Sequence, residues 1–345
     1  MAVPETMLAL VLTASGFATD VPAWHPGSLD PYLALQTIPT PTPRRGQVLI
    51  KVRLSAVNPS DIAFVQGAYA TPRVAGVPAG FEAVGEVVAS GGGLMAGTLV
   101  GRRVSFFAGI SGAWAEYAVA QAAFCIPLPR SIADDEGATL IVNPAAVWLL
   151  ADMAGRSESK AFVMTAGTSQ FCKLLTVLTA ERGGRPISLV RRADQIEPLK
   201  RLGAAHVLDT TAPDFADTLR KTFAAEAPRL LFDALASPLS VAVFSAMPRK
   251  SRWVIYGGLD AGAMPMPDPR QFIADDKQVE GFLLSNWAAE TPLLSRLRVL
   301  MGVRSRFAAG KWRTDVAERV PLRDALARLP ALLPGPNKGK ILLQP

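Results

Sequence analysis

The stretch from Thr165 to Leu175, TAGTSQFCKLL, follows a short apolar run and has the residue types of a phosphate-binding turn. A dinucleotide site needs a tight turn whose backbone N–H groups approach a pyrophosphate at the N-terminus of the next helix. Of the usual glycines only Gly167 is present, followed by Thr168, Ser169 and Gln170. Such residues are typical either of a glycine-poor dinucleotide site or of an ordinary turn between a strand and a helix.

Two arginines stand where the choice of cofactor would be decided. Arg191 and Arg192 come about 24 residues beyond Gly167, directly after the next apolar run, PISLV. An NAD site usually carries Asp or Glu there for the ribose 2′-hydroxyl, whereas arginine accommodates a 2′-phosphate. The pair would also suit a solvated strand end. We interpret it as a phosphate contact, which predicts NADPH rather than NADH.

The elements that must position these residues fall into two kinds. From about residue 145 short apolar strands alternate with helical segments, which predicts βαβ units and a parallel sheet covered on both faces. Before that point QVLIKVRLSAV, AVGEVVAS and RRVSFFAG are β-branched or aromatic runs separated by Gly and Pro. The predicted fold class is α/β, with a barrel-like, β-rich domain over 1–143 and 286–345 and a doubly wound Rossmann domain over 144–285.

The charge of the chain does not indicate a nucleic-acid partner. The sequence has 36 basic and 29 acidic residues and a net charge of +7. The basic residues come as scattered pairs, such as Arg44–Arg45 and Arg102–Arg103, without the interleaved aromatics of a nucleic-acid surface. A solvated basic surface is the simpler interpretation.

Cysteine content and hydropathy suggest the compartment. Cys125 and Cys172 are too few for a disulfide framework, which favours a reducing environment. The longest apolar stretch, ATLIVNPAAVWLLADMAG, is interrupted by Asn143 and Pro144 and is too short between breaks to span a bilayer. We expect a soluble, cytoplasmic protein that has no membrane partner.

Segments along essentially the whole chain resemble the medium-chain dehydrogenase/reductase superfamily: SAVNPSDI, AGFEAVGEVV, GAWAEYAV, LKRLGAAHVLD, VIYGG and GKILL. The resemblance implies a GroES-like barrel beside the Rossmann domain. Zinc-dependent members carry Cys where this chain has Asn58, and His-Glu where it has Phe81 and Glu82. Zinc needs a set of Cys, His and carboxylate ligands, and Glu82 alone cannot supply one. His25 and His206 lie elsewhere, so we expect no zinc.

A site without metal ligands favours a substrate that is already electrophilic. The zinc-free branch contains NADPH:quinone oxidoreductases and 2-enoyl thioester reductases, and NPSDIAFVQGAYA and GFLLSNW look more like the second group. The expected function is therefore an NADPH-dependent reductase that delivers hydride to the C=C bond of a 2-enoyl thioester of CoA or an acyl carrier, or of a related enone. A quinone reductase is the alternative, and a non-catalytic NADPH-binding structural or regulatory protein is a third possibility.

The resemblance also implies roles for single residues. Tyr69, eleven residues after Asn58, corresponds to a proton donor, although a tyrosine there could also serve only as an aromatic lid. Asn58 would face the nicotinamide or the substrate carbonyl, or it would satisfy the turn before Pro59. Further cofactor contacts are implied for Tyr256, Gly257, Phe282 and Lys340, and substrate contacts for Asn143, Asn286 and Trp287. A homodimer joined edge to edge through the Rossmann sheets is expected as well.

Overall fold

The computed structural model describes residues 3–19, 28–109, 112–260, 264–333 and 339–345. The chain divides into two compact units, one of Met1–Pro144 with Leu297–Pro345 and the other of Ala145–Arg296. The sequence placed the return to the first unit at residue 286. The contacts place it at 297, because the helix α10 (Leu284–Glu290) directly follows the last strand of the second unit.

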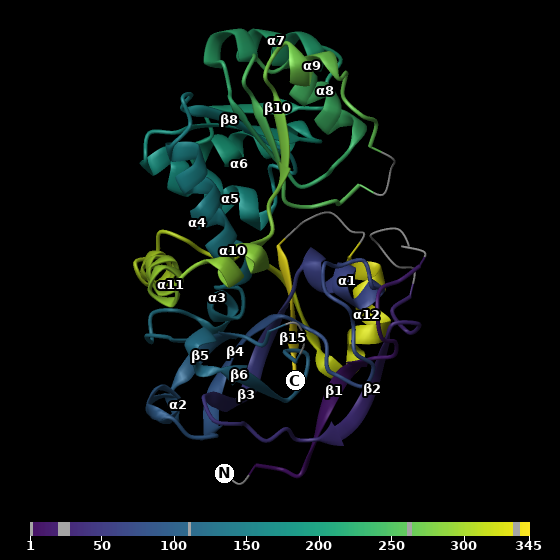
Figure 1. The fold of residues 1–345 in the computed structure, drawn as a ribbon, viewed down its shortest axis with the longest axis vertical. Helices are drawn as coiled ribbons and strands as arrows, with labels where there is room; N and C mark the ends of the chain where they lie inside the picture. Colours follow the sequence, from purple (N-terminus) through teal and green to yellow (C-terminus); the bar gives the residue numbers. More distant parts are fainter. Residues whose placement is uncertain (1–2, 20–27, 110–111, 261–263, 334–338) are drawn as a thin grey trace. The chain divides into compact units, whose positions relative to one another are not determined.

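The first unit is built on a sheet that is mainly antiparallel, as the sequence predicts. Among the described residues its strands run in the order β14-β15-β3-β4-β5-β7, with β6 also paired to β3, and β1 and β2 form a separate pair. These strands are β1 (Thr6–Leu12), β2 (Leu33–Pro39), β3 (Gln47–Val57), β4 (Glu82–Ser90), β5 (Arg103–Phe107), β6 (Tyr117–Gln121), β7 (Cys125–Pro127), β14 (Val316–Pro321) and β15 (Lys340–Gln344). Figure 1 shows β15 among strands from the first third of the chain, which is how residues of both ends meet.

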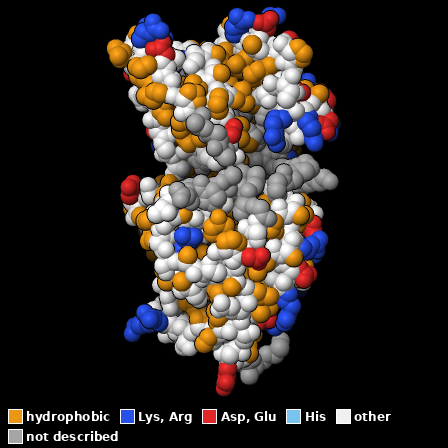
Figure 2. Space-filling model, turned by 90° about the vertical axis from the view of Figure 1, so that its right-hand side faces the viewer, with side chains coloured by type: hydrophobic (Ala, Val, Ile, Leu, Met, Phe, Trp, Pro, Cys, Tyr) orange, Lys and Arg blue, Asp and Glu red, His pale blue; other side chains and the backbone are white. Residues whose placement is uncertain are grey.

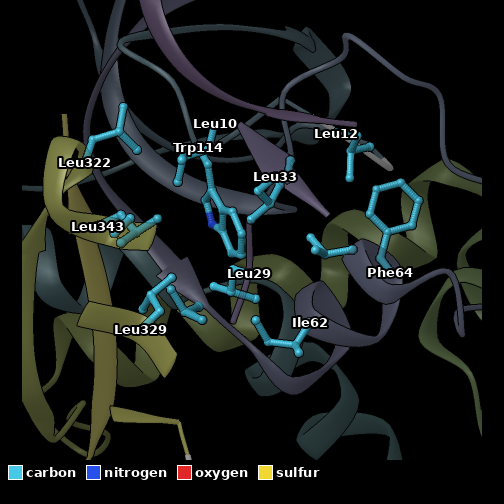
Figure 3. Packing of buried hydrophobic residues seen from close by; sticks show 14 of the residues in the cluster. Leu10, Leu12, Leu29, Leu33, Ile62, Phe64, Trp114, Leu322, Leu329 and Leu343 are labelled. Carbon is cyan, nitrogen blue, oxygen red and sulfur yellow. The ribbon is translucent and has the colours of Figure 1, made fainter. Parts of the chain in front are cut away.

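Short helices complete this unit: α1 (Pro59–Gln66), α2 (Leu94–Leu99), α3 (Asp134–Ala138), α12 (Ala325–Leu332) and most of α11 (Leu293–Ala308), with 3₁₀ turns at Ala122–Phe124 and Leu322–Asp324. One apolar cluster holds α1 in place (Figure 3). Ile62 and Phe64 of α1 pack there with Leu343 of β15 and with the fully buried Trp114, whose indole N–H donates to the Ala56 carbonyl at 3.0 Å. Burial of these large side chains fixes the start of α1 relative to the end of β3.

The second unit is a parallel sheet, again as the sequence predicts. In the part of the chain that the structure describes, its strand order is β10-β9-β8-β11-β12-β13. The strands are β8 (Ala161–Met164), β9 (Arg185–Val190), β10 (His206–Asp209), β11 (Leu230–Asp233), β12 (Arg252–Ile255) and β13 (Gln278–Gly281). The chain moves outward from β8 to β10 and then returns to β11, so β8 and β11 flank a topological switch point, where open α/β sheets bind ligands.

Helices cover both faces of the parallel sheet: α4 (Val142–Gly155), α5 (Gln170–Glu181), α6 (Ile196–Arg201), α7 (Phe215–Glu226), α8 (Pro238–Ala246) and α9 (Arg270–Ile273), with a 3₁₀ turn at Ala193–Gln195. Phe223 of α7 and Phe244 of α8 pack on one face against Val163 and Trp253. On the other face Leu199 of α6 packs against Val190 of β9. All residues of β8 and β11 are buried, as strands covered on both sides must be.

On the face drawn in Figure 2, charged side chains stand in small separate groups, in several of which Lys or Arg lies beside Asp or Glu. Among the described residues no helix combines the length and the apolar character needed to cross a bilayer.

Candidate functional site

Four polar side chains are buried together in the first unit. Asn58 precedes α1, Asp61 lies in its first turn, Glu82 begins β4 and Lys340 begins β15. β3 pairs with both β4 and β15, so these strand ends converge where β3 leads into α1. Between 0% and 7% of each residue's surface is exposed. We call these four residues the buried polar cluster.

Hydrogen bonds join the members of the buried polar cluster through Asn58. The Asn58 amide donates from Nδ2 to Oε1 of Glu82 at 2.9 Å, and its Oδ1 accepts a hydrogen bond from Nζ of Lys340. Glu82 also accepts from the backbone N–H groups of Ile141 and Val142, at 3.0 and 2.9 Å. Glu82 therefore sits at the N-terminus of α4, where unpaired helix amides favour a negative charge.

Asp61 accepts backbone hydrogen bonds on both oxygens, from Asn58 N at 2.7 Å and from Phe81 N at 2.8 Å. Burial raises the pKa of Asp61 to about 7, and the neighbouring Glu82 contributes in the same direction. Burial also raises the pKa of Glu82 and lowers that of Lys340, while the attraction between their opposite charges counteracts both shifts. The cluster thus contains a carboxyl group that titrates near neutrality beside a buried ammonium.

Two members of the cluster, Asn58 and Glu82, stand at positions where the resemblance implies metal ligands in zinc-dependent proteins. Here they are an amide and a carboxylate, and Nζ of Lys340 donates to the amide oxygen. In the described part of the chain no group of three or more His, Cys, Asp or Glu side chains is arranged to hold a metal ion. His206 bonds to Glu226 at 2.7 Å, and His25 lies outside the described residues.

Tyr69 lies on an aromatic surface that adjoins this cluster. Helix α1 ends at Gln66 and is capped by Gly67, whose φ of +81° lets the chain turn sharply toward Tyr69. The Tyr69 ring packs against Phe81 at 5.3 Å between centroids and edge-on against Phe64 at 6.4 Å. Phe81 directly precedes Glu82, so one short segment supports both the tyrosine ring and the buried carboxylate.

The turn after β8 has the tight geometry that a phosphate site requires. The Gly167 N–H donates to the Leu189 carbonyl of β9 at 2.9 Å, and a Cβ at Gly167 would lie 2.9 Å from that oxygen. Ser169 caps α5, its Oγ accepting from Cys172 N at 3.1 Å. Only a glycine allows this approach, and the first-turn amides of α5 then face the space before the helix. The residues Gly167, Thr168, Ser169 and Gln170 fit a pyrophosphate.

Side chains occupy part of the first turn of α5 where other dinucleotide sites have glycine. Tyr256, which follows β12, stacks on Phe171 with a centroid distance of 4.4 Å, and its hydroxyl lies 3.6 Å from the Cys172 sulfur. Burial raises the pKa of Tyr256 well above its usual range. Gly257 follows in close contact with Ala234, where a Cβ would lie 2.9 Å from the carbonyl oxygen. Tyr256 and Gly257 therefore border the same edge of the sheet as Gly167.

Arg191 and Arg192 stand exposed just beyond β9. Leu189, which bonds to Gly167, lies two residues before Arg191, so a guanidinium group follows directly from the strand that the turn contacts. Arg192 pairs with Asp194 at 3.1 Å. The donor set beside the turn suits a 2′-phosphate.

A buried carboxylate that the sequence analysis did not single out holds this edge together. Asp233, at the end of β11, accepts from Thr165 Oγ1 at 2.6 Å, from Ser240 Oγ at 3.0 Å and from the Trp253 indole at 3.0 Å. It also accepts from the backbone amides of residues 235 and 236. The sequence does contain one indication of this role: Asp233 is a charged residue directly after the apolar run LLF.

The remaining predicted residues lie in different places. Asn143 is the second residue of α4, next to Val142, whose amide bonds to Glu82. Asn286 is exposed on α10, whereas Phe282 and Trp287 line a cavity in the second unit. Lys340 is buried in the cluster.

Known proteins resemble this chain over its length. The family model of the alcohol dehydrogenase GroES-like domain matches residues 44–130. The mitochondrial enoyl-[acyl-carrier-protein] reductase of Caenorhabditis elegans is 27% identical over 301 residues, 85% of this chain and 86% of that protein. Prostaglandin reductase-3 of Bos taurus is 26% identical over 301 residues, 84% of this chain and 75% of the relative.

A solved structure is closer in sequence. A Mesorhizobium loti protein, provisionally assigned as an NADPH:quinone reductase, is 46% identical, with all of both chains covered and a TM-score of 0.94. Its identity and coverage, with the GroES-like match and the two sheets described above, establish the relationship. The chain belongs to the zinc-independent medium-chain dehydrogenase/reductase superfamily, and it is an NADPH-dependent oxidoreductase.

Proposed function

We propose that the protein reduces the C=C bond of a 2-enoyl thioester, of CoA or of an acyl carrier, or of a related enone. The observation that carries this proposal is the placement of Tyr69 on Phe81, directly before the buried Glu82. A phenol packed on an aromatic ring, as Tyr69 is on Phe81, is suited to donate a proton to a carbon atom. The likeness to an enoyl-[acyl-carrier-protein] reductase supports the same substrate class.

NADPH, when bound, supplies a hydride to the β-carbon of the substrate. The backbone around Gly167 and the start of α5 would hold its pyrophosphate, and Arg191 would hold its 2′-phosphate. Addition of the hydride places negative charge on the thioester oxygen. Tyr69 then donates its hydroxyl proton to the α-carbon, which completes the addition of one hydride and one proton. The tyrosinate regains its proton from solvent.

The test compares two substrates and two tyrosines. NADPH oxidation is followed by absorbance with crotonyl-CoA and with 9,10-phenanthrenequinone, for the wild type, Tyr69→Phe and the control Tyr32→Phe, a partly buried core tyrosine of the same unit. The proposal expects turnover of crotonyl-CoA, a loss of kcat of about a hundredfold in Tyr69→Phe, and little change in Tyr32→Phe. Absence of any enoyl turnover would contradict it.

A quinone reductase is the second candidate, and the 46% identical Mesorhizobium loti protein favours it. A quinone accepts a hydride and then takes its proton from water, so Tyr69 would be dispensable. Turnover of the quinone alone, at the same rate in wild type and Tyr69→Phe, would select this function.

We also propose a homodimer in which two second units pair through β13. This strand ends the sheet, and Gln278, Val279 and Gly281 are exposed on it. An uncovered strand edge offers backbone hydrogen bonds to a second copy.

A further inference from the structure

The second unit contains a cavity of about 640 Å³ that the proposed reaction does not use. Much of its polar lining comes from the amino ends of strands: Arg229 directly precedes β11, and Arg252 is the first residue of β12. Gly167 and Tyr256 follow the carboxyl ends of parallel strands in the same sheet. Because the two ends of parallel strands lie at opposite edges, this polar lining belongs to a different edge from the predicted cofactor site.

The lining of the cavity is strongly basic. Of the described side chains that form it, Arg156, Arg229, Lys250 and Arg252 are cationic, and Glu158 is the one carboxylate. Such a concentration of one sign of charge at a concave surface attracts an anion. Arg252 is already paired with Glu280 across the neighbouring strand, which holds its guanidinium in place.

Arg229 supplies a second, independent observation. Its Nη1 atom is buried and finds no hydrogen-bond partner among the described residues. A buried guanidinium N–H without an acceptor is unfavourable, because the group has lost water and gained nothing in exchange. Arg229 lines the cavity, so an anionic group there would balance the positive charge of this partly buried guanidinium.

The rest of the lining is apolar. Phe282 and Trp287 contribute aromatic side chains, and three aliphatic residues of α4 and β11 join them, Leu149, Met153 and Leu230. The volume lies within the range of about 300–1,000 Å³ typical of small-molecule sites. A purely inorganic anion would leave this apolar surface without a contact.

We propose that this cavity binds a small organic anion, a molecule with an apolar body that ends in a carboxylate or phosphate group. The anionic end would meet Arg229 and Arg252, and the body would lie against Phe282 and Trp287. Arg229 and Arg252 lie at the opposite strand ends from the dinucleotide turn, so the anionic end would not displace the pyrophosphate of NADPH. This proposal does not depend on which alkene or quinone the enzyme reduces.

Calorimetric titration of the full chain tests the site. Three probes are organic anions: dodecanoate has an aliphatic body, 1-naphthoate an aromatic body, and dodecyl phosphate a phosphate head group. Dodecanol, which has the body without the charge, and inorganic phosphate, which has the charge without the body, are the controls. The variants are Arg229→Gln and Lys250→Gln. Arg220→Gln is the matched control, an exposed arginine of the same unit that pairs with Asp217 and does not line the cavity.

We expect at least one organic anion to bind, with dodecanol and inorganic phosphate much weaker. Loss of a charged hydrogen bond should weaken binding about tenfold or more in Arg229→Gln, and Arg220→Gln should bind like the wild type. Lys250→Gln should also weaken binding. Because Lys250 is exposed, this variant should fold normally and tests the site even if Arg229→Gln misfolds. NADPH affinity should stay unchanged in all three variants.

Several results would overturn the proposal. Equal binding of dodecanol and dodecanoate would show that charge is not recognised, and binding of inorganic phosphate alone would leave the apolar lining unexplained. Unchanged affinity in both Arg229→Gln and Lys250→Gln would place the ligand elsewhere. No binding by any organic anion would remove the site altogether.

Discussion

The Nζ of Lys340 donates a hydrogen bond to Oδ1 of Asn58, a residue 282 positions earlier in the chain. The contact joins the start of the last strand, β15, to the residue that precedes the first helix, α1. Glu82 holds the opposite side of the same amide through Nδ2. Because a cation fixes one end of the amide and a carboxylate the other, Asn58 has a single favoured orientation. The lysine thus fixes the amide at the point where β3 leads into α1.

Lys340→Met should destabilise the protein strongly. The substitution removes the ammonium and leaves the Glu82 carboxylate buried without a compensating cation. Loss of one partner from a buried charge pair typically costs about 3–5 kcal/mol of unfolding free energy. Urea unfolding followed by circular dichroism measures the change.

Two variants control this measurement. Lys51→Met removes an exposed lysine of β3 and should change stability by about 0.5 kcal/mol or less. Lys340→Met combined with Glu82→Gln should recover part of the loss, because the second change removes the unpaired carboxylate. A cost for Lys340→Met no larger than that of Lys51→Met would show that the ammonium is not needed.

Asp61 should make stability fall as the pH rises. Burial raises its pKa from 3.8 to about 7, so the folded state holds a proton that the unfolded state has released between these values. The stability from this proton is fully present below the unfolded pKa and is lost as the pH rises through about 7. Between about pH 4 and pH 8 the wild type should lose about 2–4 kcal/mol relative to Asp61→Asn, which has no proton to release.

The comparison is made by urea unfolding across that pH range. Asp61→Asn is expected to be less stable at low pH, because one of the two backbone donors, Asn58 N or Phe81 N, loses its acceptor oxygen. The difference between the two proteins should then shrink with rising pH. Parallel pH profiles would mean that Asp61 is ionised throughout.

The sequence predicted the parallel sheet well because its strands are short apolar runs, such as AFVM before Gly167, separated by amphipathic helices. It did not reveal the buried polar cluster. Asp61, Glu82 and Lys340 are residue types that are usually exposed, and only the pairing of β3 with both β4 and β15 brings them together. Nonlocal strand pairing of this kind leaves no mark on local periodicity.

The predicted site residues show the same division. The turn at Gly167 follows from its local pattern, whereas Asp233 was missed because its five donors come from three separate segments. Phe282 and Trp287 line a basic cavity, whose arginines lie at the starts of strands that are distant in sequence. Their contacts with cofactor and substrate, which the resemblance between segments implies, stay a prediction.

Gly167→Ala should weaken NADPH binding about tenfold or more, because the glycine permits the close approach that a phosphate turn needs. An added Cβ would lie 2.9 Å from the Leu189 carbonyl oxygen, so the turn would have to move away from β9. Fluorescence titration with NADPH measures the effect. Gly155→Ala, at a glycine with open space around its Cβ position, should bind NADPH like the wild type. Equal affinities in both variants would place the pyrophosphate elsewhere.

Arg191→Gln should reduce the preference for NADPH over NADH. The guanidinium is exposed beyond β9 and would form a charge-assisted contact with the 2′-phosphate, which NADH lacks. The ratio of kcat/KM for the two cofactors should fall about tenfold or more, with little change for NADH. Arg220→Gln should leave the ratio unaltered. A wild type that prefers NADH would contradict the assignment outright.

Val279→Asp should convert the proposed dimer to a monomer. Val279 is 41% exposed on β13, a strand of only four residues at the end of the sheet. If two copies pair antiparallel along this strand, the substitution places two carboxylates near each other across the pair, and like charges there are destabilising. Sedimentation equilibrium over a range of concentrations measures the mass. Ile273→Asp, an equally apolar and more exposed position on α9, should leave the dimer intact. A monomeric mass for the wild type at every concentration would show that the edge of β13 stays unpaired in solution.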